Sequence, residues 1–264
     1  MNLNQKPKVI SISNQKGGVG KTTTAVNLAT ALAAINKKVL IIDLDPQGNA
    51  STSLGTDYRK APKNSYDVLM GGEKISSSIV WTKIPCLSVI AASKDLAGVD
   101  LELSRQQSPQ FFLKRAIERE NLQYDYIFID CPPAVGMLTV NALVASDTVI
   151  IPVQCEYLAL EGVADLIKTI ERVKKNFNQR LELQGVVLTM YDSRTGLSEV
   201  VAQDVRNYFG NKVYQSVIPR NVRVSEAPSH GKPILLYDYK SKGAQAYIGL
   251  AKEVLKQERK RNDC

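Results

Sequence analysis

The segment KVISISNQKGGVGKTTTAVNLATALA, residues 8 to 33, contains the pattern that decides the fold. Its apolar start is typical of a buried strand, its glycines of a tight loop, and the remainder of a helix. Strand, glycine loop and amphipathic helix in this order predict a loop that binds phosphate groups. On one face of the expected helix, apolar residues recur at helical spacing at Ala25, Leu28, Ala29 and Leu32.

This loop departs from the standard phosphate-binding pattern G-x-x-x-x-G-K-[ST] at its first position. Counting back from Gly20, Lys21 and Thr22 places the first glycine of that pattern at position 15, where this chain has Gln15. The loop instead has a second lysine, Lys16, at its entrance. A site of this kind offers two cations to the phosphates, and the role of the second needs an explanation.

The loop residues have distinct expected roles in holding a nucleotide. Glycines let the backbone N–H groups approach a phosphate, and the start of a helix adds positive potential. We expect Lys21 to bridge the β- and γ-phosphates and Thr22 to offer its hydroxyl to Mg²⁺. The residues expected to contact ATP in this segment are Lys16, Gly17, Gly18, Val19, Gly20, Lys21, Thr22 and Thr23.

Beyond the loop, short β-branched apolar runs alternate with helical patterns along the whole chain. This alternation predicts βαβ units and a parallel sheet. The length and apolar content predict one globular domain over residues 1 to 264, and a long helix is expected over residues 158 to 176. The predicted strands span residues 8 to 13, 38 to 43, 87 to 92, 124 to 130, 147 to 153, 183 to 190 and, as a seventh, 212 to 219.

Two of these strands end in acidic residues that suit a nucleotide site. The run YIFID ends in Asp130, the position of a carboxylate that holds Mg²⁺ at the carboxyl end of a parallel strand. The run IIDLD places Asp43 and Asp45 two residues apart, so both side chains point to the same face. A carboxylate at this edge can orient water for attack on a γ-phosphate.

Composition excludes several classes of function. The four cysteines lie far apart and form no C-x-x-C pair, which argues against a zinc site or a disulfide framework and for a reducing, cytoplasmic setting. The start lacks the apolar region of a signal peptide, and no apolar run approaches 18 residues, so neither export nor a membrane span is expected. A single histidine, His230, leaves no basis for a Ser-His-Asp arrangement.

Charge is unevenly distributed along the chain. Residues 1 to 171 hold 17 Lys and Arg against 17 Asp and Glu, whereas residues 172 to 264 hold 17 against 9. The formal net charge of +8 therefore comes entirely from the last third. This third is suited to an anionic partner, although a solvated basic surface would have the same composition.

Five segments of the chain carry a family resemblance: KGGVGKTTT, LIIDLDPQGNAS, YDYIFIDCPP, IPVQCEYLALEG and VIPRNVRVSEAPSHGKPI. Together they resemble the ParA/Soj family of chromosome- and plasmid-partitioning ATPases, within the deviant Walker A group of P-loop proteins. The resemblance implies a doubly wound, mainly parallel sheet flanked by helices on both faces. It also implies an ATPase that uses ATP and Mg²⁺ and forms an ATP-dependent homodimer with the nucleotides between the subunits.

The resemblance also implies roles for single residues. Lys16 would reach across the dimer to the phosphates of the partner's ATP, which accounts for the second lysine of the loop. Asp45 would position the attacking water, and Asp43 would join Thr22 and Asp130 around Mg²⁺. The remaining implied contacts are Pro219 and Asn221 near the adenine, and Arg194 and Arg223 on DNA.

The partners implied by the family are nonspecific double-stranded DNA and a ParB-like protein that stimulates hydrolysis. The expected location is therefore cytoplasmic and nucleoid-associated, with no membrane partner. The first strand begins near residue 8, so the helix-turn-helix domain that precedes the ATPase in larger plasmid ParA proteins is not expected. DNA binding would then belong to the ATPase domain itself.

A MinD-like regulator that binds a membrane surface is the competing hypothesis. MinD-like proteins end in an amphipathic helix that lies in the membrane surface. Cys131 also suggests an iron–sulfur cluster like that of the nitrogenase iron protein, but no second cysteine is suitably placed to bind one. The last helical pattern of this chain has an apolar stripe, and a stripe of this kind more often packs into a core than onto a membrane. It comprises Tyr247, Leu250, Ala251, Val254 and Leu255.

Overall fold

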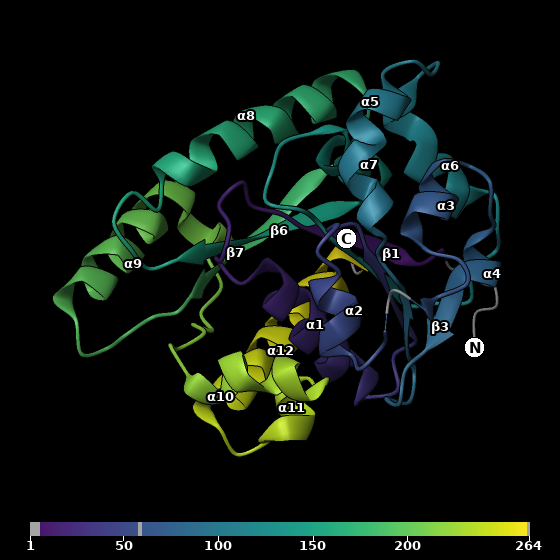
Figure 1. Cartoon of the computed structure of the whole chain (residues 1–264). Coiled ribbons are helices and arrows are strands. Elements are labelled where there is room, and N and C mark those ends of the chain that lie inside the picture. Colours follow the sequence, from purple (N-terminus) through teal and green to yellow (C-terminus); the bar gives the residue numbers. More distant parts are fainter. Residues whose placement is uncertain (1–5, 58–59, 263–264) are drawn as a thin grey trace.

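The computed structural model describes residues 6–57 and 60–262, in which helices cover both faces of a seven-stranded sheet (Figure 1). The strand order is β3-β4-β2-β5-β1-β6-β7, and every neighbouring pair is parallel except β3 with β4. The predicted doubly wound α/β fold is thus confirmed. The strands are β1 (Lys8–Ile12), β2 (Val39–Asp43), β3 (Ile79–Trp81), β4 (Leu87–Ile90), β5 (Tyr126–Asp130), β6 (Thr148–Gln154) and β7 (Glu182–Thr189).

The helices form two layers, one on each side of the sheet (Figure 1). One layer contains α1 and α12, and the other contains α5 to α8. The helices are α1 (Lys21–Ala33), α2 (Asn49–Ser53), α3 (Ser65–Leu69), α4 (Ile75–Ser78), α5 (Val99–Leu103), α6 (Phe112–Glu118), α7 (Met137–Ala145), α8 (Glu161–Asn176), α9 (Gly196–Phe209), α10 (Val222–Glu226), α11 (Ile234–Tyr237) and α12 (Lys242–Asn262), with short 3₁₀ turns η2 (Lys94–Gly98), η3 (Pro109–Phe111), η4 (Gly210–Lys212) and η5 (Ala227–His230).

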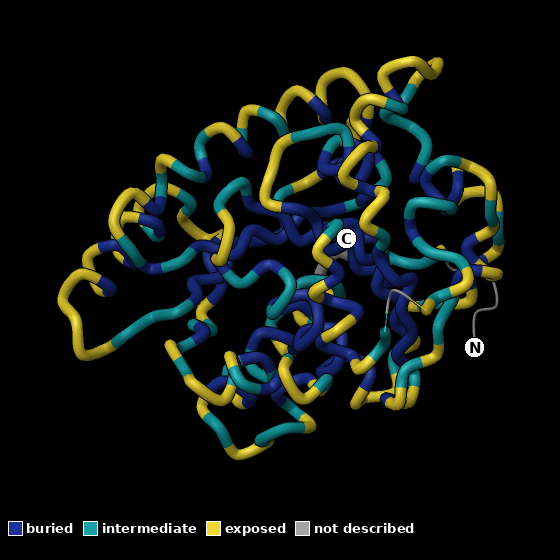
Figure 2. The backbone as a smooth tube through the Cα atoms, in the orientation of Figure 1, coloured by how far each residue is buried: buried dark blue, intermediate teal, exposed yellow. Residues whose placement is uncertain are grey.

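Strand side chains alternate between the two layers, which explains why the strands are apolar almost throughout. Leu40 and Ile42 pack in the cluster that contains α6 and α7, whereas Ile41 packs in the cluster that contains α1 and α12. A parallel sheet covered on both faces needs apolar residues at successive positions. Figure 2 shows the result, a buried sheet surrounded by helices whose outer turns are exposed.

The prediction of a strand over residues 212 to 219 is wrong. This segment runs beside β7 but forms only isolated bridges with it and the residues that follow it, at Val213 and Pro219, and no continuous ladder. Between the bridges, the backbone N–H groups of Gln215 and Ser216 donate to the carboxylate of Glu253 on α12, at 2.8 and 2.7 Å. A side-chain acceptor replaces the strand partner there, and the ladder is interrupted.

The seventh strand is instead β3, which the sequence pattern did not predict. It has three residues, follows α4 directly and pairs antiparallel with β4. A run of three residues is too short for an alternation of apolar and polar positions to stand out. Its position at the edge of the sheet leaves Trp81 78% exposed.

The last helix packs its apolar stripe into the core. Tyr247, Leu250, Ala251 and Val254 are all buried in the cluster that also contains α1. This stripe is therefore not available to lie on a membrane surface. Within the part of the chain that the structure describes, no helix is long and apolar enough to cross a membrane.

Candidate nucleotide site

Three aspartates lie at the carboxyl edge of the sheet, where the glycine loop begins. β2 and β5 are neighbours, and their register places Asp43 opposite Asp130. β1 lies on the other side of β5 with Ile12 opposite Asp130, so the loop after β1 starts beside that carboxylate. Asp45 follows Asp43 by two residues and is 6% exposed. The register of the sheet thus brings together residues that are far apart in sequence.

The glycine loop has the backbone conformation that its glycines permit. Gly18 and Gly20 have φ angles of 76° and 88°, in the left-handed region that other residues avoid. Gly20 precedes the first turn of α1, and its carbonyl accepts from the N–H of Thr24 at 2.9 Å. The first N–H groups of α1 have no partners within the helix, so they are free to bind an anion.

Two residues that the sequence pattern missed hold this loop from outside. The hydroxyl of Thr189, at the end of β7, donates to the carbonyl of Val19 at 2.8 Å. The side chain of Asn14 accepts from the N–H of Lys16 at 3.0 Å and donates to the carbonyl of Pro152 at 2.7 Å. The position of Asn14 just before the loop was a usable signal, whereas nothing local identified Thr189.

Lys21 lies almost completely buried under the loop. Its Nζ donates to the carbonyl of Lys16 at 2.9 Å, and the residue is 6% exposed. Burial lowers the pKa of Lys21, and the nearby carboxylate of Asp130 partly opposes this shift. An anion bound in the loop would stabilise the charged form of this ammonium group.

Asp130 is a buried carboxylate without hydrogen-bond partners. Both of its oxygens are buried and accept no hydrogen bond from the described residues. Burial, and next the charge of Asp43, raise the pKa of Asp130 well above its usual range. The Thr22 hydroxyl lies close enough to oppose this shift but does not reach the geometry of a hydrogen bond. An isolated buried carboxylate is costly unless a cation neutralises it.

The surroundings of Asp130 fit a magnesium ion. Mg²⁺ prefers oxygen ligands and usually takes only one or two carboxylates, with waters and substrate phosphates completing its shell. Asp130 and Thr22 offer such oxygens beside the loop. Among the described residues, no group of three or more His, Cys, Asp or Glu could hold a metal ion alone. The residues present therefore suit an ion that arrives with a phosphate group.

Asp43 differs from Asp130 because its oxygens are engaged. One oxygen accepts from the N–H and hydroxyl of Ser51 on α2, at 2.9 and 2.7 Å, and the other accepts from the N–H of Asp45 at 3.2 Å. Burial raises the pKa of Asp43 to about 6, while the hydrogen bonds from Ser51 oppose the shift. Asp43 thus fixes the start of α2, a contact that the sequence did not indicate.

Lys16 takes a different direction from Lys21. Its ammonium group forms an ion pair with Glu156, in the segment between β6 and α8, and its side chain is 41% exposed. The charge of Lys16 is therefore paired with Glu156, whereas the ammonium group of Lys21 lies under the loop. The geometry leaves the two lysines of the loop with separate surroundings.

The remaining predicted residues form a second group near α10. Asn221 caps α10 by accepting from the N–H of Arg223 at 2.9 Å, and Pro219 bridges to Tyr191 after the end of β7. This bridge places the segment before α10 beside the loop that contains Arg194. The structure therefore places Arg194, Pro219, Asn221 and Arg223 on neighbouring segments.

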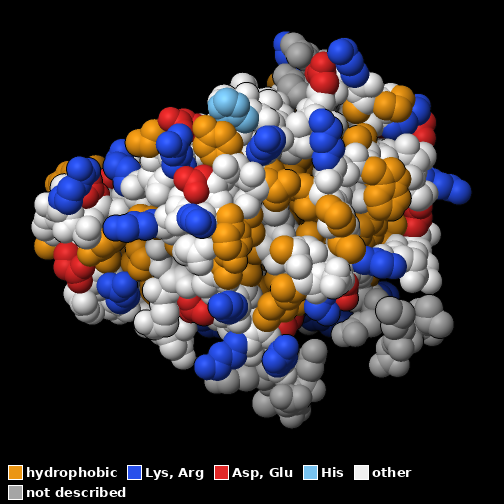
Figure 3. Space-filling model, turned by 90° about the horizontal axis from the view of Figure 1, so that it is seen from below, with side chains coloured by type: hydrophobic (Ala, Val, Ile, Leu, Met, Phe, Trp, Pro, Cys, Tyr) orange, Lys and Arg blue, Asp and Glu red, His pale blue; other side chains and the backbone are white. Residues whose placement is uncertain are grey.

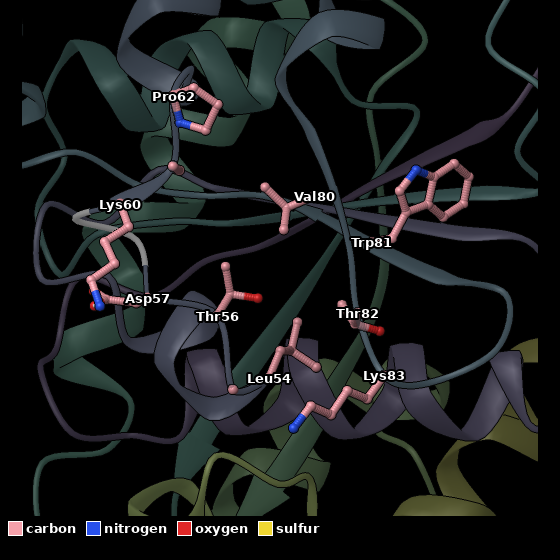
Figure 4. A pocket seen from close by; sticks show the side chains of 11 residues that line it. Leu54, Thr56, Asp57, Lys60, Pro62, Val80, Trp81, Thr82 and Lys83 are labelled. Carbon is pink, nitrogen blue, oxygen red and sulfur yellow. The ribbon is translucent and has the colours of Figure 1, made fainter.

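A hollow of about 330 Å³ lies elsewhere, between the segment after α2 and strand β3 (Figure 4). Val80 and Thr82 of this edge reach toward it, whereas Trp81 points away (Figure 4). No predicted site residue lines this hollow. The described residues that line it are Leu54, Gly55, Thr56, Asp57, Lys60, Ala61, Pro62, Val80, Trp81, Thr82 and Lys83.

Comparisons with known proteins agree with this geometry. The sequence matches the AAA domain family over residues 7–183. It is 57% identical over 256 residues to the chromosome partitioning protein ParA of Caulobacter vibrioides, with 96% of each chain covered. It is 54% identical over 247 residues to the sporulation initiation inhibitor protein Soj of Bacillus subtilis, covering 94% of this chain and 98% of that protein. A solved structure of cobyrinic acid a,c-diamide synthase from Mycobacterium smegmatis, with bound ADP and magnesium, is similar with a TM-score of 0.85, 38% identity and 96% coverage of each chain.

Proposed function

Because the chain belongs to the ParA/Soj family of partitioning ATPases, we propose that it binds ATP and Mg²⁺ and hydrolyses ATP as a homodimer. The observation that carries this proposal is the buried, unpartnered carboxylate of Asp130 beside Thr22 and Lys21. The similar structure with ADP and magnesium supports an adenine nucleotide and magnesium as the ligands. We assign the whole activity to one domain spanning residues 1 to 264.

In this proposal the loop binds the phosphates through the backbone N–H groups of residues 17 to 23, while the N–H of Lys16 stays with Asn14. Lys21 exchanges its hydrogen bond with the carbonyl of Lys16 for phosphate oxygens. Mg²⁺ supplies positive charge that offsets the charge of the phosphates during transfer. Thr22 and Asp130 would hold the ion, while Asp43 contributes negative charge and keeps α2 in place. Pro219 and Asn221 are assigned to the surroundings of the adenine.

We assign Lys16 to the nucleotide of the second subunit. Its ammonium group pairs with Glu156 at a partly exposed position, whereas Lys21 already serves the loop of its own subunit. A charge that reaches the γ-phosphate only when two subunits meet makes hydrolysis depend on dimerisation. The same arrangement would make the dimer depend on ATP.

Replacing Asp45 should separate hydrolysis from assembly. Asp45 is assigned to the attacking water, and its carboxylate is held in the turn before α2 by the N–H of Gln47 at 3.0 Å. We expect Asp45→Ala to slow turnover about 100-fold, the usual contribution of a general base, and to change ATP affinity little. Parallel measurements of turnover and ATP binding would check this. Loss of ATP binding would instead place Asp45 at the magnesium ion.

The second anionic ligand in this proposal is duplex DNA of any sequence. The last third of the chain carries the whole net positive charge, and Arg194 and Arg223 lie in it on exposed segments. Lys and Arg side chains are spread across the lower face of the molecule (Figure 3). A dimer doubles the number of phosphate contacts, so the nucleotide state would control DNA binding.

Removing either arginine should weaken DNA binding without preventing dimerisation. We expect Arg223→Ala to lower the affinity of the ATP-bound protein for duplex DNA about tenfold or more, the usual effect of losing a charged hydrogen bond. Arg194→Ala should cause an equal or smaller loss. The salt dependence should also become shallower. Gel shifts on two unrelated duplexes measure this, and unchanged affinity in both variants would remove these residues from the DNA contact.

The expected protein partner is a ParB-like protein that stimulates hydrolysis, and DNA binding would place the chain on the nucleoid in the cytoplasm. ATPase activity measured with and without DNA and such a partner tests the proposal. We expect turnover to rise most when both are present. Turnover that neither ligand changes would contradict a partitioning role.

A further inference from the structure

Both arginines assigned to DNA already pair with carboxylates in the single protomer. Arg194 pairs with Asp192, and Arg223 pairs with Glu226 and faces Asp238. A guanidinium group has a limited set of N–H donors, and a phosphate needs the same donors as a carboxylate. Each DNA contact therefore competes with an acid of the same chain.

The ion pair at Arg194 occupies the edge of the guanidinium group that would bind a phosphate best. Its Nε and Nη2 donate to the two oxygens of Asp192, at 2.8 and 2.6 Å. This two-point arrangement is the one that guanidinium groups also use to bind phosphate. The side chain of Arg194 is 82% exposed, so DNA could reach it, but its bidentate edge faces the acid.

The structure holds the carboxylate of Asp192 in a fixed position beside Arg194. Its side chain is only 16% exposed, and one oxygen also accepts from the backbone N–H of Arg194 at 3.1 Å. The hydrogen bonds from Arg194 hold the pKa of Asp192 well below its usual range. The acid is therefore ionised while it is paired with Arg194, and it competes with phosphate for the guanidinium group.

The pair at Arg223 is supported by a second set of contacts. Its Nη1 donates to Glu226 at 3.0 Å, and its Nε lies 3.8 Å from Asp238. The Tyr237 hydroxyl donates to the same oxygen of Glu226 at 3.3 Å. The Tyr237 ring in turn stacks on the ring of His230, with 4.9 Å between the ring centroids. Glu226 is thus positioned by α11 and η5 to face the arginine.

We propose that Asp192 and Glu226 limit the DNA affinity of this chain by occupying Arg194 and Arg223 until phosphates displace them. This inference rests on the proposed DNA binding. In one subunit, the few available phosphate contacts must each replace an ion pair, so binding stays weak. In a dimer, the phosphate contacts act together and overcome the same competition. The acids would thereby make DNA binding depend more strongly on ATP.

Neutral replacements of the two acids test the inference. Asp192→Asn and Glu226→Gln keep the side-chain shapes and one of the two acceptor oxygens, but they remove the charge and replace the other oxygen with an NH₂ group that cannot accept from the arginine. We expect each to raise the affinity of the ATP-bound protein for duplex DNA about three- to fivefold, the upper range for an exposed ion pair. The double variant should gain about tenfold, with a steeper salt dependence, and should bind DNA at low salt without ATP.

Asp204→Asn is the control, because it removes the charge of an exposed acid that lies on α9, outside these pairs. Its effect on DNA affinity should be smaller than that of Asp192→Asn, since distant exposed charges are screened by salt. If the two variants gained DNA affinity equally, net charge alone would explain the effect, and the inference would be overturned. Weaker DNA binding in a folded Asp192→Asn or Glu226→Gln would overturn it too, because the acids would then orient the arginines.

The wild-type protein separates this inference from the proposed function. If wild-type protein with ATP binds no DNA, the proposed DNA binding fails, and the inference fails with it. If wild-type protein binds DNA and the neutral variants bind no tighter, only the inference fails. Thermal unfolding of each variant would show that the comparison is made between folded proteins.

Discussion

Replacing Lys21 with alanine is expected to abolish stable ATP binding. Lys21 is buried beneath the loop, and its ammonium group is the cation nearest to Asp130 that the loop provides. Hydrogen bonds to charged groups contribute about 1.5 to 3 kcal/mol each, so losing this cation should lower ATP affinity about 100-fold or more. Isothermal titration with ATP and Mg²⁺ measures the effect.

Lys37→Ala is a suitable control for this variant. Lys37 pairs with Asp125 at 3.5 Å near the start of β2, away from the glycine loop, and its side chain is 40% exposed. ATP affinity should stay within about twofold of wild type, because an exposed ion pair contributes little. Lys21→Ala should also fail to dimerise with ATP. Near-normal ATP binding by Lys21→Ala would contradict the assignment of this loop to the phosphates.

Replacing Lys16 with alanine should have an equally large effect on a different step. Because Lys16 is directed to its ion pair with Glu156 and not to the place of Lys21, the variant should still bind ATP as a monomer. It should not form the ATP-dependent dimer, and hydrolysis should fall to background. A cation supplied by a second molecule contributes about 10³-fold or more in related phosphoryl-transfer reactions.

Light scattering with and without ATP distinguishes the two lysine variants. Lys21→Ala should fail at nucleotide binding, whereas Lys16→Ala should bind nucleotide and fail at assembly. Normal ATP-dependent dimerisation of Lys16→Ala would contradict its role across the subunit interface. Loss of ATP binding in Lys16→Ala would show that it serves the nucleotide of its own subunit.

The parts of the fold that the sequence predicted correctly are those with long, regular patterns. β1, β2 and β5 are mainly apolar because both faces of the parallel sheet are covered, and the glycine loop with α1 has a distinctive order of residue types. The predicted segment of residues 212 to 219 has an apolar pattern similar to a strand. Its pairing is decided by Glu253, which is far away in sequence and cannot be inferred from a local pattern.

The candidate site shows the same division between local and distant information. The sequence indicated Asp43, Asp45 and Asp130, because each ends or follows a recognisable strand. It gave no indication that Ser51 would engage the carboxylate of Asp43 while leaving that of Asp130 unpartnered. The contact of Thr189 with Val19 depends on the place of β7 in the sheet, where only β6 separates it from β1. The order of strands along the chain does not reveal this place.

The central claim is that the nucleotide state controls DNA binding, and equilibrium binding of the wild-type protein tests it most directly. Two unrelated duplexes would be titrated without nucleotide, with ADP, and with a non-hydrolysable ATP analogue and Mg²⁺, each at several salt concentrations. We predict tight binding only with the ATP analogue, equal on both duplexes and falling steeply as salt rises. Equally tight binding in all three nucleotide states, or binding that salt does not weaken, would contradict the account.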